Sequence, residues 1–90
     1  MSDKNIFLND NYLVLEVLYN YRQQVNNQVF TAITQQEIAD ILGYSIMKIN
    51  SIMIKLKKTG YVISYNNTKG RYQLTAKSYQ LITKINSLEA

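Results

Sequence analysis

Two helix starts separated by a glycine constrain the fold of this chain more than any other feature. Thr34 and Glu37 have the spacing of a capping box, in which the Thr hydroxyl accepts the amide N–H three residues on and the Glu carboxylate accepts the Thr amide N–H. Gly43 stands where a helix must turn sharply through positive φ, and Ser45 can cap the next helix. The pattern predicts a short helix after Thr34, a tight turn and a second helix over residues 46–58.

Apolar residues recur at the helical period in both of these segments. Lys57 and Lys58 fall in the last turn of the second helix, where cations suit the helix dipole, and Thr59-Gly60 ends it. The expected inner face consists of Ile38, Ala39, Ile41 and Leu42 in the first helix and of Ile49, Ile52, Met53 and Leu56 in the second.

Another helix is expected near the N-terminus, capped by Asn9 or Asp10. Residues 12–21 are apolar around most of the helical circumference, which is typical of a helix at the centre of a core or shared with another subunit. The helix fades into the polar residues 22–24. Residues 1–8 are expected to form an arm, and its apolar part is expected to dock on this chain or on a partner.

Turn and strand patterns account for the rest of the chain. Asn26-Asn27 indicates a turn, and the β-favouring residues 29–31 indicate a short strand. Residues 61–75 are expected to form a hairpin, with strands over 61–65 and 71–75 and a polar loop between them. Thr75 can cap a last helix over residues 76–88, with Tyr79, Ile82 and Ile85 on one side and Leu81 and Leu88 next to them.

These elements predict a mainly α fold with a small β-hairpin (α+β), in the order helix, strand, helix, helix, hairpin, helix. Ninety residues can bury one modest core, so residues 1–90 are expected to form a single domain. No stretch of about 20 apolar residues exists to span a membrane, and the N-terminus lacks the layout of a signal peptide. We therefore expect a cytoplasmic protein.

The composition argues against catalysis and metal binding. The chain has no Cys and no His, which removes disulfides, thiolate metal sites and the commonest general base and zinc ligand. None of the six acids forms an obvious catalytic pair, since Glu37 and Asp40 are better explained as a solvated helix face. We expect no enzyme, no cofactor and no metal.

Charge is distributed unevenly along the chain. The formal net charge is +4, but residues 41–88 contain eight Lys or Arg and no carboxylate. A basic surface attracts polyanions, because each neutralised phosphate releases counterions. Charge alone is also compatible with a basic surface that has no partner.

Residues 34–64, TQQEIADILGYSIMKINSIMIKLKKTGYVIS, resemble the helix-turn-helix core of the winged-helix regulators, especially those of the MarR type. The matching features are the Thr34 cap, the Glu37-Ile38-Ala39 start, Leu42-Gly43-Tyr44-Ser45 at the turn and the stretch from Leu56 to Val62 at the exit. The resemblance implies a helix-turn-helix over 34–58 and a wing over 61–75, and with the flanking helices it covers roughly residues 9–88.

The resemblance implies that double-stranded DNA is the partner. The helix over 46–58 would lie in the major groove, and residues 66–71 of the wing would lie on the backbone or in the minor groove. Lys48 can donate to guanine or phosphate and Asn50 can pair with adenine, while hydroxyls at helix starts can hold phosphates. The candidate DNA-binding residues are Thr34, Gln35, Ser45, Met47, Lys48, Asn50, Ser51, Lys55, Asn67, Lys69 and Arg71.

Several positions have a second explanation. Lys57 and Lys58 could add phosphate contacts or could only satisfy the helix dipole. For Lys77 and Lys84, exposure to solvent on the last helix is favoured over contact with DNA. The apolar Ile46, Met47 and Ile54 lie off the core stripe, where polar residues are usual in a recognition helix. They could pack on thymine methyl groups or contact a second subunit.

Winged-helix regulators usually bind paired half-sites as two-fold dimers, so the resemblance implies a homodimer. The arm at Ile6, Phe7 and Leu8, the first helix and the Leu81/Leu88 edge supply more apolar surface than a monomer of this size easily hides. We expect a dimer through the first and last helices. The functional hypotheses are a transcriptional regulator, a plasmid or phage partition or replication-control protein, and a winged-helix protein-interaction module that does not bind DNA.

Overall fold

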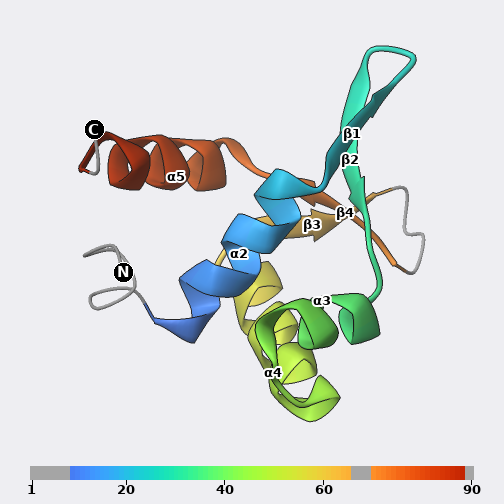
Figure 1. Ribbon diagram of the computed structural model, residues 1–90. Helices are drawn as coiled ribbons and strands as arrows, with labels where there is room; N and C mark the ends of the chain where they lie inside the picture. Colours follow the sequence, from blue (N-terminus) through green and yellow to red (C-terminus); the bar gives the residue numbers. More distant parts are fainter. Residues whose placement is uncertain (1–8, 66–69, 89–90) are drawn as a thin grey trace.

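The computed structural model describes residues 9–65 and 70–88, and Figure 1 shows how their helices and strands are arranged. The expected N-terminal arm (residues 1–8) and the hairpin tip that carries Asn67 and Lys69 lie outside the described residues. The elements are α2 (Asp10–Asn20), β1 (Arg22–Val25), β2 (Gln28–Ala32), α3 (Gln35–Leu42), α4 (Ile46–Lys58), β3 (Val62–Ser64), β4 (Arg71–Leu74) and α5 (Ala76–Leu88).

The strand β1 corrects the prediction that the first helix fades through residues 22–24. α2 ends at Asn20, and β1 pairs antiparallel with β2 from Arg22↔Thr31 to Val25↔Gln28. The predicted turn between them is present, since Asn26 and Asn27 have φ values of 51° and 66°. Two successive residues with positive φ match the right-handed twist of a tight hairpin, and Asn tolerates that conformation better than most residues. A second hairpin therefore precedes the helix-turn-helix.

The two hairpins join into one four-stranded antiparallel sheet with the order β1-β2-β4-β3. Thr31 and Ala32 of β2 pair with Tyr72 and Arg71 of β4, so the strand that leads into α3 lies beside the last strand. In Figure 1 the β1–β2 hairpin projects from one side of the domain, while α3 and α4 lie together on the other side.

The predicted caps of the helix-turn-helix are confirmed atom by atom. The Thr34 hydroxyl accepts from the Glu37 N–H at 3.1 Å, and the Glu37 carboxylate accepts from the Thr34 N–H at 3.0 Å. Gly43 has the left-handed φ of 72°, and the Ser45 hydroxyl accepts from the Lys48 N–H at 3.1 Å. Each helix end is thus satisfied by residues within the segment, so local sequence specifies this turn.

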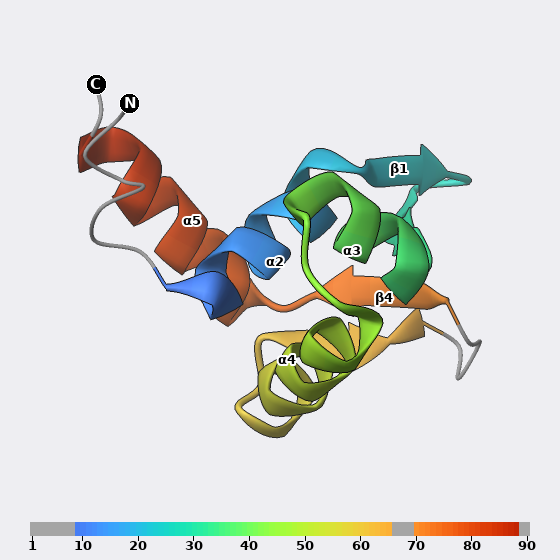
Figure 2. The same cartoon turned by 60° about the horizontal axis from the view of Figure 1, so that its bottom comes forward.

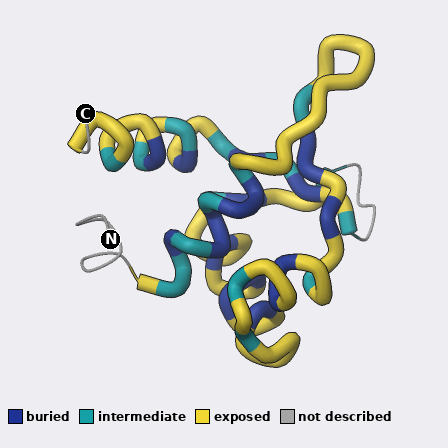
Figure 3. The backbone as a smooth tube through the Cα atoms, in the orientation of Figure 1, coloured by how far each residue is buried: buried dark blue, intermediate teal, exposed yellow. Residues whose placement is uncertain are grey.

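α2 lies at the centre of the core, as its many-sided apolar pattern predicted. Its buried residues pack with those of α3, α4 and the sheet, and the predicted inner stripe of α4 is buried (Figure 3). One expected core position is wrong, because Ile41 of α3 is 47% exposed. The described core consists of Tyr12, Val14, Leu15, Val17, Leu18, Ile33, Ile38, Ala39, Ile49, Ile52, Met53, Leu56, Val62, Tyr72, Leu74 and Ile82.

α5 is fixed to the domain by its first turns. Thr75 directly precedes α5, and its carbonyl accepts from the Tyr79 N–H at 3.2 Å, while its hydroxyl donates to the Gly60 carbonyl at 2.7 Å and so ties the exit of α4 to the end of β4. Ser78 is buried and donates to the Tyr61 carbonyl, and Ile82 is buried two turns into the helix. The other end of α5 extends away from the core (Figure 1). No helix among residues 9–65 and 70–88 has the length and hydropathy needed to cross a membrane.

Candidate nucleic-acid interface

α4 presents four different faces to its surroundings. Ile49, Ile52, Met53 and Leu56 face the core and are buried. One flank, with Ile46, Asn50 and Lys57, lines an open groove beside the start of α3 and the wing strands. The other flank, with Lys48 and Lys55, lies beside the start of α2. The remaining residues, among them Met47, Ser51, Ile54 and Lys58, are exposed.

The open groove, of about 660 Å³, is the place where elements distant in sequence meet. It brings three of the predicted DNA-binding residues, Thr34, Gln35 and Asn50, together with Lys57. In the view of Figure 2, β4 is drawn between α3 and α4. The complete lining is Thr34, Gln35, Gln36, Ile46, Asn50, Lys57, Ser64, Gly70 and Tyr72. Helix-start amides, an amide side chain and a cation thus surround one concave surface.

Two cations border this groove from neighbouring elements. The Lys57 Nζ lies 5.3 Å from the centroid of the Tyr72 ring, so a wing strand supports this ammonium group. The Arg71 guanidinium carbon lies 5.6 Å from the centroid of the Phe30 ring, and Arg71 pairs with Ala32 at the strand that leads into α3. Both side chains are exposed and keep hydrogen-bond donors for an anion.

Lys48 does not point freely into solvent. Its Nζ lies 2.8 Å from the Asp10 carboxylate of α2 and 4.0 Å from the centroid of the Tyr44 ring. The Tyr44 hydroxyl donates to the other Asp10 oxygen at 2.6 Å. These two donors, Lys48 first, lower the pKa of Asp10, and acceptance by Asp10 raises the pKa of Tyr44. The Asp10 carboxylate therefore partly neutralises Lys48, the first Lys of α4.

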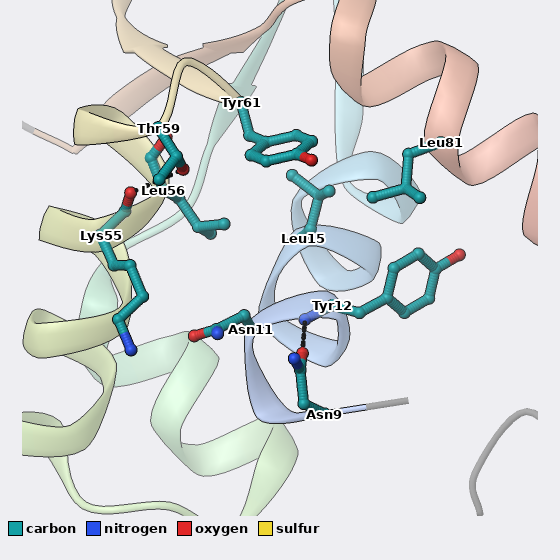
Figure 4. Close-up of a pocket in the computed structure, with 9 residues that line it drawn as sticks. All are labelled: Asn9, Asn11, Tyr12, Leu15, Lys55, Leu56, Thr59, Tyr61 and Leu81. Carbon is teal, nitrogen blue, oxygen red and sulfur yellow. Dashed lines mark hydrogen bonds between the residues drawn. The ribbon is translucent and has the colours of Figure 1, made fainter. Parts of the chain in front are cut away.

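Lys55 lies away from the groove, beside a second and smaller pocket of about 220 Å³ (Figure 4). Asn9 and Asn11 at the start of α2 and Leu81 of α5 line the same pocket. In Figure 4 the Lys55 side chain extends along α4 next to Asn11. A contact from Lys55 would thus reach a ligand at the flank of α4 that faces α2.

Ser45 and Ser51 complete the predicted residues within the described chain. The Ser45 hydroxyl accepts one backbone hydrogen bond and retains its own proton for donation, as does the Thr34 hydroxyl. Ser51 is exposed on α4, the helix that also carries the apolar Met47 and Ile54. Asn67 and Lys69 lie outside the described residues and stay predictions.

The sequence did not place Ser64 and Tyr72 at the site, although both line the groove. The alternating pattern identifies Tyr72 only as an inward residue of a strand, and its pairing with Thr31 depends on the order of strands in the sheet. The sequence indicates Asp10 only as a helix cap. No local pattern links it to Lys48, because the two residues meet through the packing of α2 on α4.

The described residues contain no cluster of three Asp, Glu, His or Cys side chains that could hold a metal ion. The side chains that line the groove are mainly hydroxyl, amide and cationic donors, and no carboxylate or imidazole is among them. The chemistry of this surface suits recognition of an anion.

A short capped helix, a glycine turn, a second helix and a two-stranded wing define a winged helix-turn-helix domain, the class that the sequence resembled. Residues 11–88 match the family model described as "Winged helix-turn-helix transcription repressor, HrcA DNA-binding". The match covers most of the chain, so this protein belongs to that family of winged-helix DNA-binding domains.

Solved structures share the fold at low sequence identity. The reduced, Fe(II) CO-sensing protein from R. rubrum is 20% identical with a TM-score of 0.68, and the match covers 81% of this chain and 34% of that protein. A transcriptional regulator of the CRP/FNR family from Thermus thermophilus is 16% identical with a TM-score of 0.69, over 90% of this chain and 44% of that one. Reduced CprK without ligand is 16% identical with a TM-score of 0.53, over 83% and 38% of the two chains. This chain spans less than half the length of each, and no curated protein sequence matches it.

Proposed function

We propose that this protein binds double-stranded DNA and acts as a dimeric transcriptional regulator. The observation that carries the proposal is the open groove, where Thr34, Asn50 and Lys57 converge from the start of α3 and from α4, next to the wing. The family is one of DNA-binding domains of transcription repressors, which supports the same function. Repression is therefore the favoured direction of control.

In the proposed complex α4 enters the major groove and β3–β4 lies against the backbone or in the minor groove. The hydroxyls of Thr34 and Ser45 and the first amides of α3 would hold phosphates, since helix N-termini favour anions. Lys57, Lys58 and Arg71 would neutralise further phosphates on both sides of the groove. Phosphate contacts of this kind supply affinity and register, while base edges supply sequence preference.

The proposal is tested by fluorescence anisotropy with a labelled A·T-rich duplex over a range of about 50 to 200 mM salt. Each neutralised phosphate adds roughly 0.9 to the log–log salt slope. A Lys57→Gln/Arg71→Gln variant should therefore bind more weakly and have a slope that is flatter by roughly 1.8. Circular dichroism of the variant should match that of the parent protein.

A matched control separates a specific surface from general charge. Lys77→Gln/Lys84→Gln removes two positive charges from α5, where Lys77 donates to the Thr59 carbonyl at 2.8 Å, and Gln keeps an N–H donor at that position. This variant should retain the parent slope. Absence of binding at low salt would contradict the DNA proposal, and equal losses in both double variants would contradict the proposed surface.

The dimer belongs to the same proposal. α5 is fixed at Ser78 and Ile82 and carries the 79%-exposed Leu88 at its far end, next to the half-buried Ile85. This exposed apolar end supports self-association through α5 and α2, which would align two copies of α4 with two half-sites. The MarR-type relationship and a role in plasmid or phage partition stay predictions.

One observation favours a second candidate, a winged-helix module that binds protein. Met47 and Ile54 are exposed and apolar on α4. A protein partner would bind through these residues with weak dependence on salt, whereas DNA binding must weaken steeply as salt rises. The salt series thus distinguishes the two functions.

A further inference from the structure

We infer that the exposed face of α4 reads thymine methyl groups, so that this domain prefers A·T-containing major grooves through their C5 methyls. The inference rests on the proposed DNA binding and specifies which base edges α4 recognises. Met47 is 81% exposed, Ile54 is 57% exposed and Ile46 is 48% exposed, all on one 13-residue helix. Apolar side chains at such positions need an apolar partner in the complex.

The thymine methyl is the apolar group that the major groove of unmodified DNA displays. Met47 and Ile54 are seven residues apart and so occupy the same side of α4, two turns from each other. Asn50 lies between them in sequence and can bond the N6 and N7 edge of the adenine that pairs with thymine. The three side chains together suit a run of A·T pairs.

The same helix is poorly equipped to read G·C pairs. α4 contains no Arg for a bidentate bond to guanine and no Asp or Glu to accept from cytosine. Lys48, its first Lys, is held by Asp10 at 2.8 Å and by the Tyr44 ring at 4.0 Å. Lys55 lies on the flank beside the start of α2. α4 thus has no Arg, two of its four Lys lie on the flank that faces α2, and the other two, Lys57 and Lys58, lie at its C-terminal end.

Charge decides between DNA and a second copy of this chain as the occupant. The apolar residues are interleaved with the cations Lys48, Lys55, Lys57 and Lys58 of the same helix, and residues 41–88 contain no carboxylate. Two such faces would repel each other, whereas a polyanion with apolar methyls complements both the charge and the apolar stripe.

The experiment compares two duplexes in the anisotropy assay. Both have about three helical turns and the same non-repeating order of bases. The first contains only A·T pairs, and in the second deoxyuridine replaces every thymidine, so that all pairs are A·U. This replacement removes the C5 methyls and keeps the Watson–Crick edges and the phosphates. Because burial of one methyl-sized group changes affinity by roughly fourfold, two contacts predict binding weaker by about 16-fold for the uridine duplex. The salt slope should not change, since no phosphate contact is lost.

Variants assign the methyl effect to named residues. Met47→Ala/Ile54→Ala should bind both duplexes with nearly equal affinity, because the side chains that contact the methyls are gone. Val25→Ala is the control, since Val25 is an exposed apolar residue at the end of β1, on the hairpin that projects away from α4 (Figure 1). It should retain the full preference for thymidine.

Each outcome bears on one claim. Tight, salt-dependent binding with equal affinity for both duplexes would overturn the methyl inference and leave DNA binding intact. A preference for thymidine that persists in Met47→Ala/Ile54→Ala would also overturn it, because the preference would then arise from duplex shape. Failure to bind either duplex at low salt would overturn DNA binding itself, and the inference with it.

Discussion

Asp10 is the residue that most restrains the cationic surface of α4. It accepts from Lys48 and from Tyr44, and it does so from α2, outside the helix-turn-helix. Asp10 thus holds Lys48 in place. In the proposed complex with DNA, the Asp10 carboxylate would compete with phosphate for the same ammonium group.

Asp10→Asn should tighten DNA binding several-fold, and the salt slope should steepen by up to roughly 0.9 if Lys48 gains one phosphate. Asp40→Asn makes the same change in net charge on α3, where Asp40 accepts from Gln36 at 2.9 Å. It should have a smaller effect on affinity. Equal gains from both variants would show that total charge, rather than the release of Lys48, controls affinity.

The lowered pKa of Asp10 predicts how stability depends on pH. A carboxyl with a folded-state pKa below its ordinary value of 3.8 stabilises the folded state above that value, and loses this contribution as pH falls through the lowered pKa. The free energy of unfolding of the parent should therefore exceed that of Asp10→Asn near neutral pH, and the gap should close in acid. Urea denaturation at several pH values measures it, and a constant gap would contradict the role of the ion pair.

At the scale of elements, the helix-turn-helix depends on one backbone conformation at Gly43. Its φ is 72°, and a Cβ built there has no heavy atom within 4 Å, so strain and not collision would oppose a side chain. Gly43→Ala should reduce the free energy of unfolding by about 1 kcal/mol, and Gly43→Asn by less, since Asn tolerates the left-handed region. Thermal denaturation compares the three proteins, and an equal loss for Ala and Asn would contradict this explanation.

The same scale shows what the sequence could and could not predict. α3, the turn and α4 were predictable, because Thr34, Gly43 and Ser45 act on residues within one turn of themselves. β1 was not, because Arg22, Gln23 and Gln24 suit a helix as well as a strand, and only pairing with β2 selects the strand. The exposure of Ile41 could not be predicted from periodicity, since a helical pattern does not show which other element, if any, packs against a given side of the helix.

The groove depended on still longer-range information. The sequence predicted Thr34, Gln35 and Asn50 as site residues, and they do meet in one groove. Tyr72 and Ser64 join them only through the pairing of β4 with β2 and β3. The link between Asp10 and Lys48 likewise requires α2 to pack on α4. The site residues that were missed are those that the sheet order and helix packing supply.

For the whole molecule, the exposed end of α5 predicts self-association. Ile85→Glu/Leu88→Glu should shift the protein from dimer toward monomer in sedimentation equilibrium, because two carboxylates replace apolar groups that a second copy would cover. Lys84→Glu/Ser87→Glu places two carboxylates at exposed positions of the same turns and serves as the control. A parent protein that sediments as a monomer at micromolar concentration would contradict the dimer.

The uneven attachment of α5 has a consequence for exchange of its amide hydrogens. The first turns are held by Ser78 and Ile82, while the last turns rest on no buried residue of α5 within the described chain. In dilute protein the two halves should exchange at different rates, slowly up to Ile82 and rapidly beyond it. If exchange of the second half alone slows as protein concentration rises, its exchange rate reports how much of the protein is self-associated.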